Sequence, residues 1–159
     1  MIILCFIFYF STFLYSDIIN IPSDYTTIQE GINAANTGDT VLVATSPEPY
    51  RENLIIEKTI TLASHAIFDD LSNGWIDDDL NIYNDNIANT ILDGGNSNSN
   101  SVIFINSPPE SGCIEPEIFG FTITDGSGTI ILIDLVDENN VPFQQEANMG
   151  GGIYVNNAL

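Results

Sequence analysis

Seven short runs rich in β-branched and aromatic residues follow one another between residues 41 and 155, with turn residues between them. They are Val41–Val43, Leu54–Ile56, Ile60–Leu62, Ile91–Leu92, Val102–Ile105, Phe119–Ile123 and Ile153–Val155. The centres of the first two runs are 13 residues apart, and those of the fourth and fifth are 12 apart. The spacing from Leu62 to Leu92 is 30 residues, and from Ile123 to Tyr154 it is 31. A three-strand unit is therefore predicted to repeat, with Leu62 and Ile123 in equivalent strands.

Such a repeat, with connections of variable length, favours an all-β coil of parallel strands in which each turn stacks on the previous one. An antiparallel sandwich is the alternative, but it needs short hairpins between neighbouring strands. No two-residue Asn-Gly or Asp-Gly link joins adjacent runs. Asp93-Gly94-Gly95 and Asp125-Gly126 instead open long connections.

A short amphipathic helix is expected before these runs, over about residues 24–37. Ile28, Ile32 and Ala35 fall on one helical face. Thr26 and Gln29 have the spacing of a capping box, and Gly38 follows the last periodic residue. The apolar face has no local partner, so it must pack against a later part of the chain.

The opening segment, residues 1–16, is almost entirely apolar and resembles the hydrophobic region of a secretory signal. We expect its removal to leave a secreted or cell-surface domain, residues 17–159, with no stable membrane span. The alternatives are an uncleaved membrane anchor and a buried first strand. Cys5 lies inside this segment. Cys113 would then have no intramolecular disulfide partner, so packing must hold the fold together.

The charge balance excludes whole classes of partner. The chain has 22 acidic residues against Arg51 and Lys58, a net charge of −20. Two cations cannot form the basic surface that nucleic acids or anionic membranes require, so no nucleic-acid partner is predicted. Arg51 and Lys58 are expected to be structural or solvated residues.

Several segments resemble right-handed β-helix proteins of the pectin-lyase-like superfamily, especially the opening segment of pectinesterases. They are IPSDYTTIQEGINAANTGDTVLVA, PYRENLIIEKTITLAS, TILDGG, FGFTITDGSG and GGGIYVNNA. The resemblance implies a right-handed parallel β-helix, a solenoid, whose open end is capped by the N-terminal helix. The chain would then be the N-terminal part of a longer domain. The pectinesterase catalytic residues (two Asp, a Gln and an Arg) have no counterparts here, so no complete catalytic site is predicted.

Two long lateral loops, 64–89 and 125–151, are expected to leave the same corner of successive turns and to stack beside each other. Together they carry 11 of the 22 acidic residues. Crowded carboxylates can recruit Ca²⁺, which takes several oxygen ligands in flexible geometry. The candidate calcium ligands are Asp77, Asp78, Asp79, Asp137 and Glu138. The alternatives are a solvated acidic surface and, more weakly, a carboxylate pair for glycoside hydrolysis.

Aromatic residues in the first loop suggest a carbohydrate-binding platform. Trp75 and Tyr83 can each lie against the apolar face of a pyranose, with neighbouring carboxylates accepting hydroxyl hydrogens. The alternative is that they pack with Ile130–Val136 in a satellite apolar cluster. The predicted function is therefore an adhesin-like protein that binds an extracellular polysaccharide. A pectin-active enzyme with catalytic residues further downstream and a structural stalk remain the alternatives.

Overall fold

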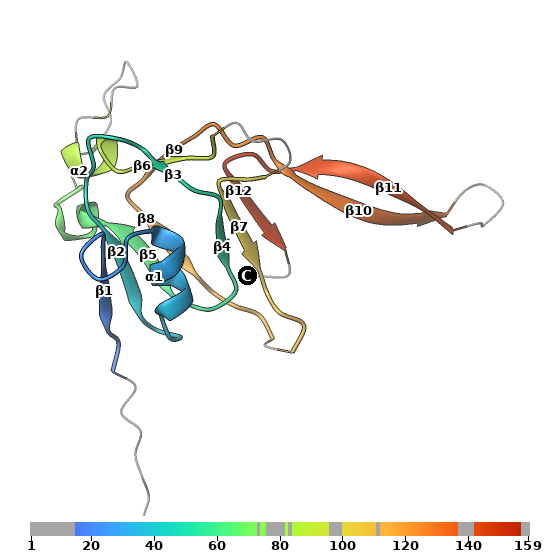
Figure 1. Cartoon of the computed structure of the whole chain (residues 1–159), viewed down its shortest axis with the longest axis horizontal. Coiled ribbons are helices and arrows are strands. Elements are labelled where there is room, and N and C mark those ends of the chain that lie inside the picture. Colours follow the sequence, from blue (N-terminus) through green and yellow to red (C-terminus); the bar gives the residue numbers. More distant parts are fainter. Residues whose placement is uncertain are drawn as a thin grey trace, which may run out of the picture.

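A computed structural model describes residues 15–72, 74–75, 82, 84–95, 100–110, 112–136 and 142–156. Figure 1 shows the order of the elements along the chain. They are β1 (Ile18–Ile21), α1 (Ile28–Ala34), β2 (Thr40–Val43), β3 (Tyr50–Arg51), β4 (Leu54–Ile56), β5 (Thr61–Ser64), the 3-10 helix η1 (His65–Phe68), α2 (Asp85–Ala88), β6 (Ile91–Asp93), β7 (Ile103–Asn106), β8 (Glu117–Phe119), β9 (Thr122–Thr124), β10 (Thr129–Val136), β11 (Pro142–Met149) and β12 (Ile153–Asn156).

Three short parallel sheets surround the core. Their strand orders are β1-β2-β5-β8, β3-β6-β9 and β12-β7-β4. From β2 onward the chain passes through the three sheets in turn, so strands that pair are distant in sequence. β10 and β11 form a separate antiparallel ribbon that projects from the body of the fold (Figure 1).

The prediction of an all-β right-handed parallel β-helix, or solenoid, is wrong. The described part of the chain is a small mixed fold with three parallel sheets of three or four strands, an antiparallel ribbon and short helices. Two findings overturn the predicted repeat. Leu62 and Ile123, assigned to equivalent strands, lie in different sheets, and β10 and β11 run in opposite directions.

The predicted repeat failed because the run Phe119–Ile123 is two strands rather than one. Gly120 has a φ of +79°, and it turns the chain from β8 in one sheet to β9 in another. Leu62 therefore pairs with Ile118, whereas Ile123 pairs with Leu92. The predicted equivalence of the second and fifth runs is confirmed, because β4 and β7 pair in parallel.

The inward-facing side chains of the three sheets and of α1 form one buried cluster. Because successive strand residues face opposite sides, alternate residues enter the core, as Leu54 and Ile56 do in β4. Each fully buried aliphatic side chain contributes about 1.5–3 kcal/mol. The cluster comprises Ile21, Ile28, Ile32, Ala35, Val41, Val43, Leu54, Ile56, Ile60, Leu62, Leu92, Val102, Ile103, Ile105 and Ile114.

The far end of the fold is open within the described residues. β8, β9 and β12 are each the last strand of their sheet and pair on one side only. Ile153 and Val155 are 41% and 47% exposed, although their register partners in β7 are 0% and 6% exposed. Apolar side chains in the core positions of β12 are thus left in contact with solvent.

α1 covers the opposite end. It is shorter than the predicted 24–37, and its capping box joins Thr27 to Glu30 rather than Thr26 to Gln29. The side-chain oxygen of Thr27 accepts from the Glu30 N–H, and the Glu30 carboxylate accepts from the Thr27 N–H. The predicted apolar face is confirmed: Ile28, Ile32 and Ala35 are at most 3% exposed.

Two charged side chains fasten α1 to the first strands. The Glu52 carboxylate accepts from the backbone N–H groups of Ile28 and Gln29, at 2.9 and 3.0 Å. The Lys58 ammonium donates to the carbonyls of Asn33 and Ala35. These charges complement the two ends of the helix, which carry unpaired N–H groups at the start and unpaired carbonyls at the end.

Removal of the Glu52 carboxylate should loosen this attachment. Because hydrogen bonds to a charged group are stronger than neutral ones, we expect Glu52→Ala to lower the free energy of unfolding by about 1–2 kcal/mol. Urea denaturation measures the change. Glu48→Ala is the matched control, since Glu48 is exposed and its side chain makes no described bond. Equal stability of the two variants would contradict this role of Glu52.

Asp39 holds the turn between α1 and β2. It is 2% exposed, and its carboxylate accepts from the Asp17 N–H at 2.9 Å and the Asn36 N–H at 2.7 Å. These bonds, that of Asp17 most strongly, lower the pKa of Asp39. A lowered folded-state pKa stabilises the fold above the unfolded-state pKa, and this contribution is lost as pH falls through the folded value.

The stability difference between the native chain and Asp39→Asn should therefore depend on pH. We expect the variant to be less stable at neutral pH, and the difference to shrink as pH falls below about 4, where the native carboxylate becomes protonated. Urea unfolding at a series of pH values measures it. A difference that stays constant down to pH values near 2 would show that the Asp39 charge contributes nothing.

Candidate functional site

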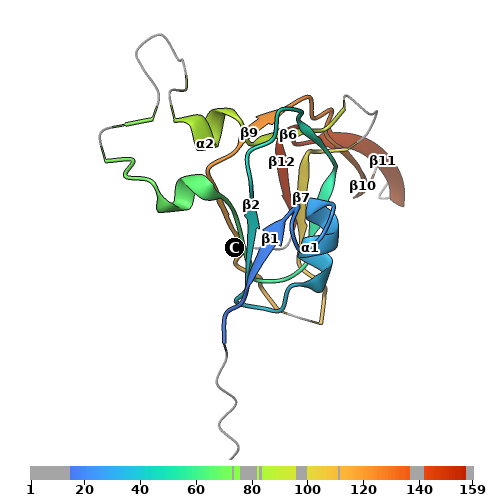
Figure 2. The same cartoon turned by 60° about the vertical axis from the view of Figure 1, so that its left-hand side comes forward.

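An apolar groove lies where the connection between β5 and β6 meets the β8–β9 bend. Its volume is about 210 Å³. The connection leaves the body of the fold beside α2 (Figure 2). The lining residues are Leu71, Trp75, Ile87, Ile118, Phe119, Gly120 and Phe121.

Two aromatic side chains of the groove are open to solvent. Trp75 is 40% exposed and Phe119 is 38% exposed. Phe121, also in the groove, packs against the core cluster and is only partly buried. An exposed apolar groove with aromatic walls is a surface that can bury the apolar face of a ligand.

Gly120 shapes the groove. Its positive φ lets β8 and β9 diverge, and the absence of a side chain lets the bend approach the end of β5. A Cβ at this position would lie 2.5 Å from the Ser64 hydroxyl oxygen and 2.8 Å from the Ala66 Cβ. The placement of Phe119 and Phe121 thus depends on this one residue.

Two acidic residues lie next to a groove residue in the sequence. Asp69 and Asp70 immediately precede Leu71 in the chain. One carboxylate oxygen of Asp69 accepts from the side-chain amides of Asn84 and Asn86, at 2.9 and 2.8 Å. These bonds, with that of Asn86 the larger effect, lower the pKa of Asp69. Hydrogen bonding by Ser72 lowers the pKa of Asp70 in the same way.

Of the predicted carbohydrate-binding residues, the structure places Trp75 in the groove, whereas Tyr83 lies outside the described residues. Leu71, Phe119 and Phe121 were not predicted as site residues. Phe119 and Phe121 were assigned to a single strand, which would place both on the same side of its sheet. The glycine between the two aromatics was the available sign of a bend.

The calcium ligands predicted from the sequence, Asp77, Asp78, Asp79, Asp137 and Glu138, lie outside the described residues. The stacking of the two segments that carry them is wrong, however. Segment 64–89 joins β5 to β6, whereas segment 125–151 contains the β10–β11 ribbon and joins β9 to β12. The two leave the body on different sides (Figures 1 and 2). The described residues contain no group of three His, Cys, Asp or Glu side chains that could hold a metal.

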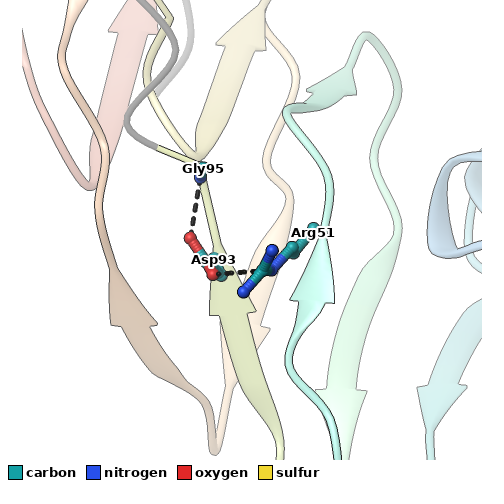
Figure 3. Close-up of polar contacts among 3 residues, drawn as sticks. All are labelled: Arg51, Asp93 and Gly95. Atoms are coloured by element: carbon teal, nitrogen blue, oxygen red, sulfur yellow. Dashed lines mark hydrogen bonds and ion pairs between the residues drawn. The ribbon is translucent and has the colours of Figure 1, made fainter.

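A small polar pocket of about 220 Å³ lies at the ends of β3, β6 and β9, lined by Arg51, Asp93, Gly95 and Asp125. Figure 3 shows the ion pair between Arg51 Nε and an Asp93 oxygen at 3.3 Å. The other Asp93 oxygen accepts from the Gly95 N–H at 2.7 Å. Because both oxygens of Asp93 are engaged, this carboxylate is a structural group that fixes the Asp93-Gly94-Gly95 turn.

A larger cavity of about 380 Å³ lies beside the base of the β10–β11 ribbon. Its hydroxyl groups bond to each other, since the oxygens of Ser101 and Thr129 are 3.0 Å apart. Phe104 in its wall stacks on Tyr154, with ring centroids 5.4 Å apart. These contacts show that the cavity lies at the junction between the ribbon and the sheet. Its aromatic residue, Phe104, is less exposed to solvent than Trp75.

No family model, curated protein or solved structure matches this chain. The resemblance to pectin-lyase-like proteins accordingly stays a prediction. None of the helices in the described residues is long and apolar enough to cross a membrane.

Substitution of Gly120 tests how the groove is built. Gly120→Ala should cost about 2–4 kcal/mol, because it adds a steric clash to the strain of a positive φ. Gly38→Ala is the control: Gly38 has a φ of +94° with no atom within 4 Å of the added Cβ, so only strain of about 1–2 kcal/mol is expected. Equal losses in chemical denaturation would mean that close packing at the bend is unimportant.

Proposed function

We propose that this chain binds a polysaccharide outside the cell or at the cell surface, through the groove that contains Trp75. The observation that carries the proposal is the partial exposure of Trp75, the chain's single tryptophan, in the wall of an apolar groove. A tryptophan normally buries most of its surface. One left in an open groove offers a flat apolar face to a ligand.

The chemistry of the groove matches a sugar ring. The C–H groups on one face of a pyranose form an apolar surface that can cover an indole or phenyl ring, and hydroxyl groups project around its edge. Trp75 and Phe119 supply aromatic surface for the first, and the carboxylates of Asp69 and Asp70 are acceptors for hydroxyl hydrogens. Asp69 and Asp70 directly precede Leu71 of the groove in the chain, which is what supports including them in the proposal.

Export is proposed on the apolar segment of residues 1–16, which has the composition of a secretory signal. The net charge of −20 is consistent with an extracellular binding protein that has no nucleic-acid partner. A pectin-active enzyme is less well supported. The Arg51–Asp93 pair gives no sign of a reactive carboxylate, since both Asp93 oxygens are already bonded.

Replacement of Trp75 should abolish most of the binding. Loss of a stacking aromatic at the centre of an interface costs about 2 kcal/mol, so we expect Trp75→Ala to weaken binding at least about tenfold. The measurement is affinity electrophoresis of the native chain and the variant against a panel of soluble neutral and acidic polysaccharides.

Phe68→Ala is the matched control. Phe68 belongs to η1 and is 70% exposed, but it does not line the groove. Its removal should leave affinity unchanged. If the native chain retained no member of the panel, or if both variants bound as the native chain does, the proposed function would be wrong.

A further inference from the structure

A row of apolar side chains crosses the outer face of the β12-β7-β4 sheet. Ile55, Phe104 and Tyr154 are register partners on the three strands. The residues on either side of them along each strand occupy core positions, so these three side chains project outward. Ile55 is 47% exposed. Apolar surface that remains exposed on a folded chain often marks a binding site.

The cavity beside the base of the β10–β11 ribbon adjoins this row. Ile55 and Phe104 line it, but Tyr154 does not. Tyr154 stacks on Phe104 with 13° between the ring planes, so it covers one face of the Phe104 ring and holds the ring in place. The opposite face is left for the cavity, and Ile130, which is 44% exposed, adds a further apolar wall. The volume of about 380 Å³ is within the range of small-ligand sites, about 300–1,000 Å³.

The polar part of the cavity lining is uncharged. It consists of two amide residues and two hydroxyl residues, Asn53, Asn100, Ser101 and Thr129. The Asn53 amide nitrogen donates to the Ser101 carbonyl at 3.0 Å, and the Ser101 and Thr129 hydroxyls bond to each other. These bonds hold three of the four side chains in place before a ligand arrives. Asn100 is exposed, and its amide can both donate and accept.

The composition of the lining restricts the kind of ligand. Among the described residues that line the cavity there is no Lys, Arg, Asp or Glu, although the chain has 22 acidic residues. A phosphate or carboxylate would find no cation there, and an amine would find no carboxylate. A wholly apolar ligand would leave the amides and hydroxyls without partners. An uncharged sugar ring satisfies both parts of the lining, with its C–H face and its hydroxyl edge.

We infer that this cavity is a second binding site, for an uncharged sugar ring of a polysaccharide. The ring lies against Phe104, and its hydroxyls bond to Asn100 and Thr129. The inference goes beyond the proposed function, because the cavity shares no lining residue with the Trp75 groove. Phe104 is less exposed than Trp75, so we expect the cavity to bind more weakly than the groove.

Isoleucine methyl resonances can follow the two sites separately in one NMR sample. Ile55 and Ile130 line the cavity, whereas Ile87 and Ile118 line the Trp75 groove. The chain, labelled at its isoleucine δ1 methyls, is titrated with four uncharged hexamers: β-1,4-linked glucose, mannose and xylose, and α-1,4-linked glucose. We expect at least one hexamer to shift Ile55 and Ile130, and to do so equally in Trp75→Ala.

Two substitutions in the cavity should weaken this binding. Phe104→Leu keeps an apolar side chain but removes the ring, so we expect a loss of about two- to tenfold in affinity. Ile130→Thr shortens the facing wall, retains the Phe104–Tyr154 stack and keeps a β-branched residue in β10, and it should also weaken binding at Ile55. Phe68→Leu is the matched control, since Phe68 is 70% exposed and lines neither site.

The inference is wrong if no hexamer shifts Ile55 and Ile130, if those shifts disappear in Trp75→Ala, or if both cavity variants bind as the native chain does. It is also wrong if these methyls shift on dilution of the protein alone, because the cavity would then be a contact between two copies. Shifts at the cavity methyls without shifts at the groove methyls would support the inference and count against the Trp75 groove. Shifts at the groove methyls alone would do the reverse.

Discussion

The fold depends on how the exposed edge of its first strands is covered. An unpaired strand edge presents backbone N–H and carbonyl groups that need partners. At β4 the partner is the side-chain amide of Gln29: its oxygen accepts from the Ile55 N–H at 2.8 Å, and its nitrogen donates to the Ile55 carbonyl at 3.1 Å. One side chain of α1 thus replaces a neighbouring strand. Glu52 and Lys58 then fix the two ends of α1, so that Ile28 and Ile32 are held over the core.

The groove follows from the same framework. The β8–β9 bend can lie against the end of β5 only because the residue between Phe119 and Phe121 is a glycine. The other wall, with Leu71 and Trp75, comes from the connection between two different sheets, and the Asp69 bonds to Asn84 and Asn86 tie the two ends of that connection together. The groove is therefore formed by segments that are distant in sequence, and its shape is a consequence of the strand pairing.

Local pattern was a good guide to local structure here and a poor guide to the order of the strands. The apolar face of Ile28 and Ile32 was readable from its helical spacing, and Trp75 could be singled out as a lone tryptophan in an acidic segment. β3 is only two residues long and carries no apolar run, so it was not predicted. Without it, the predicted order in which the chain passes through the three sheets was shifted. The apolar run Ile130–Val136 was visible, but only pairing with residues 142–149 shows that it is half of a ribbon.

The three sheets are covered at one end and open at the other, so the two ends of the fold differ in how firmly their outermost strands are held. At one end α1 supplies hydrogen bonds and apolar cover. At the other, Ile153 and Val155 meet water, and the strands there are bonded on one flank only. Thermal fraying therefore has a preferred origin, because detaching an outermost strand breaks one ladder whereas detaching a central strand breaks two. Phe119 and Phe121 lie beside that origin, so the groove that they line is in the part of the fold where we expect local opening to begin.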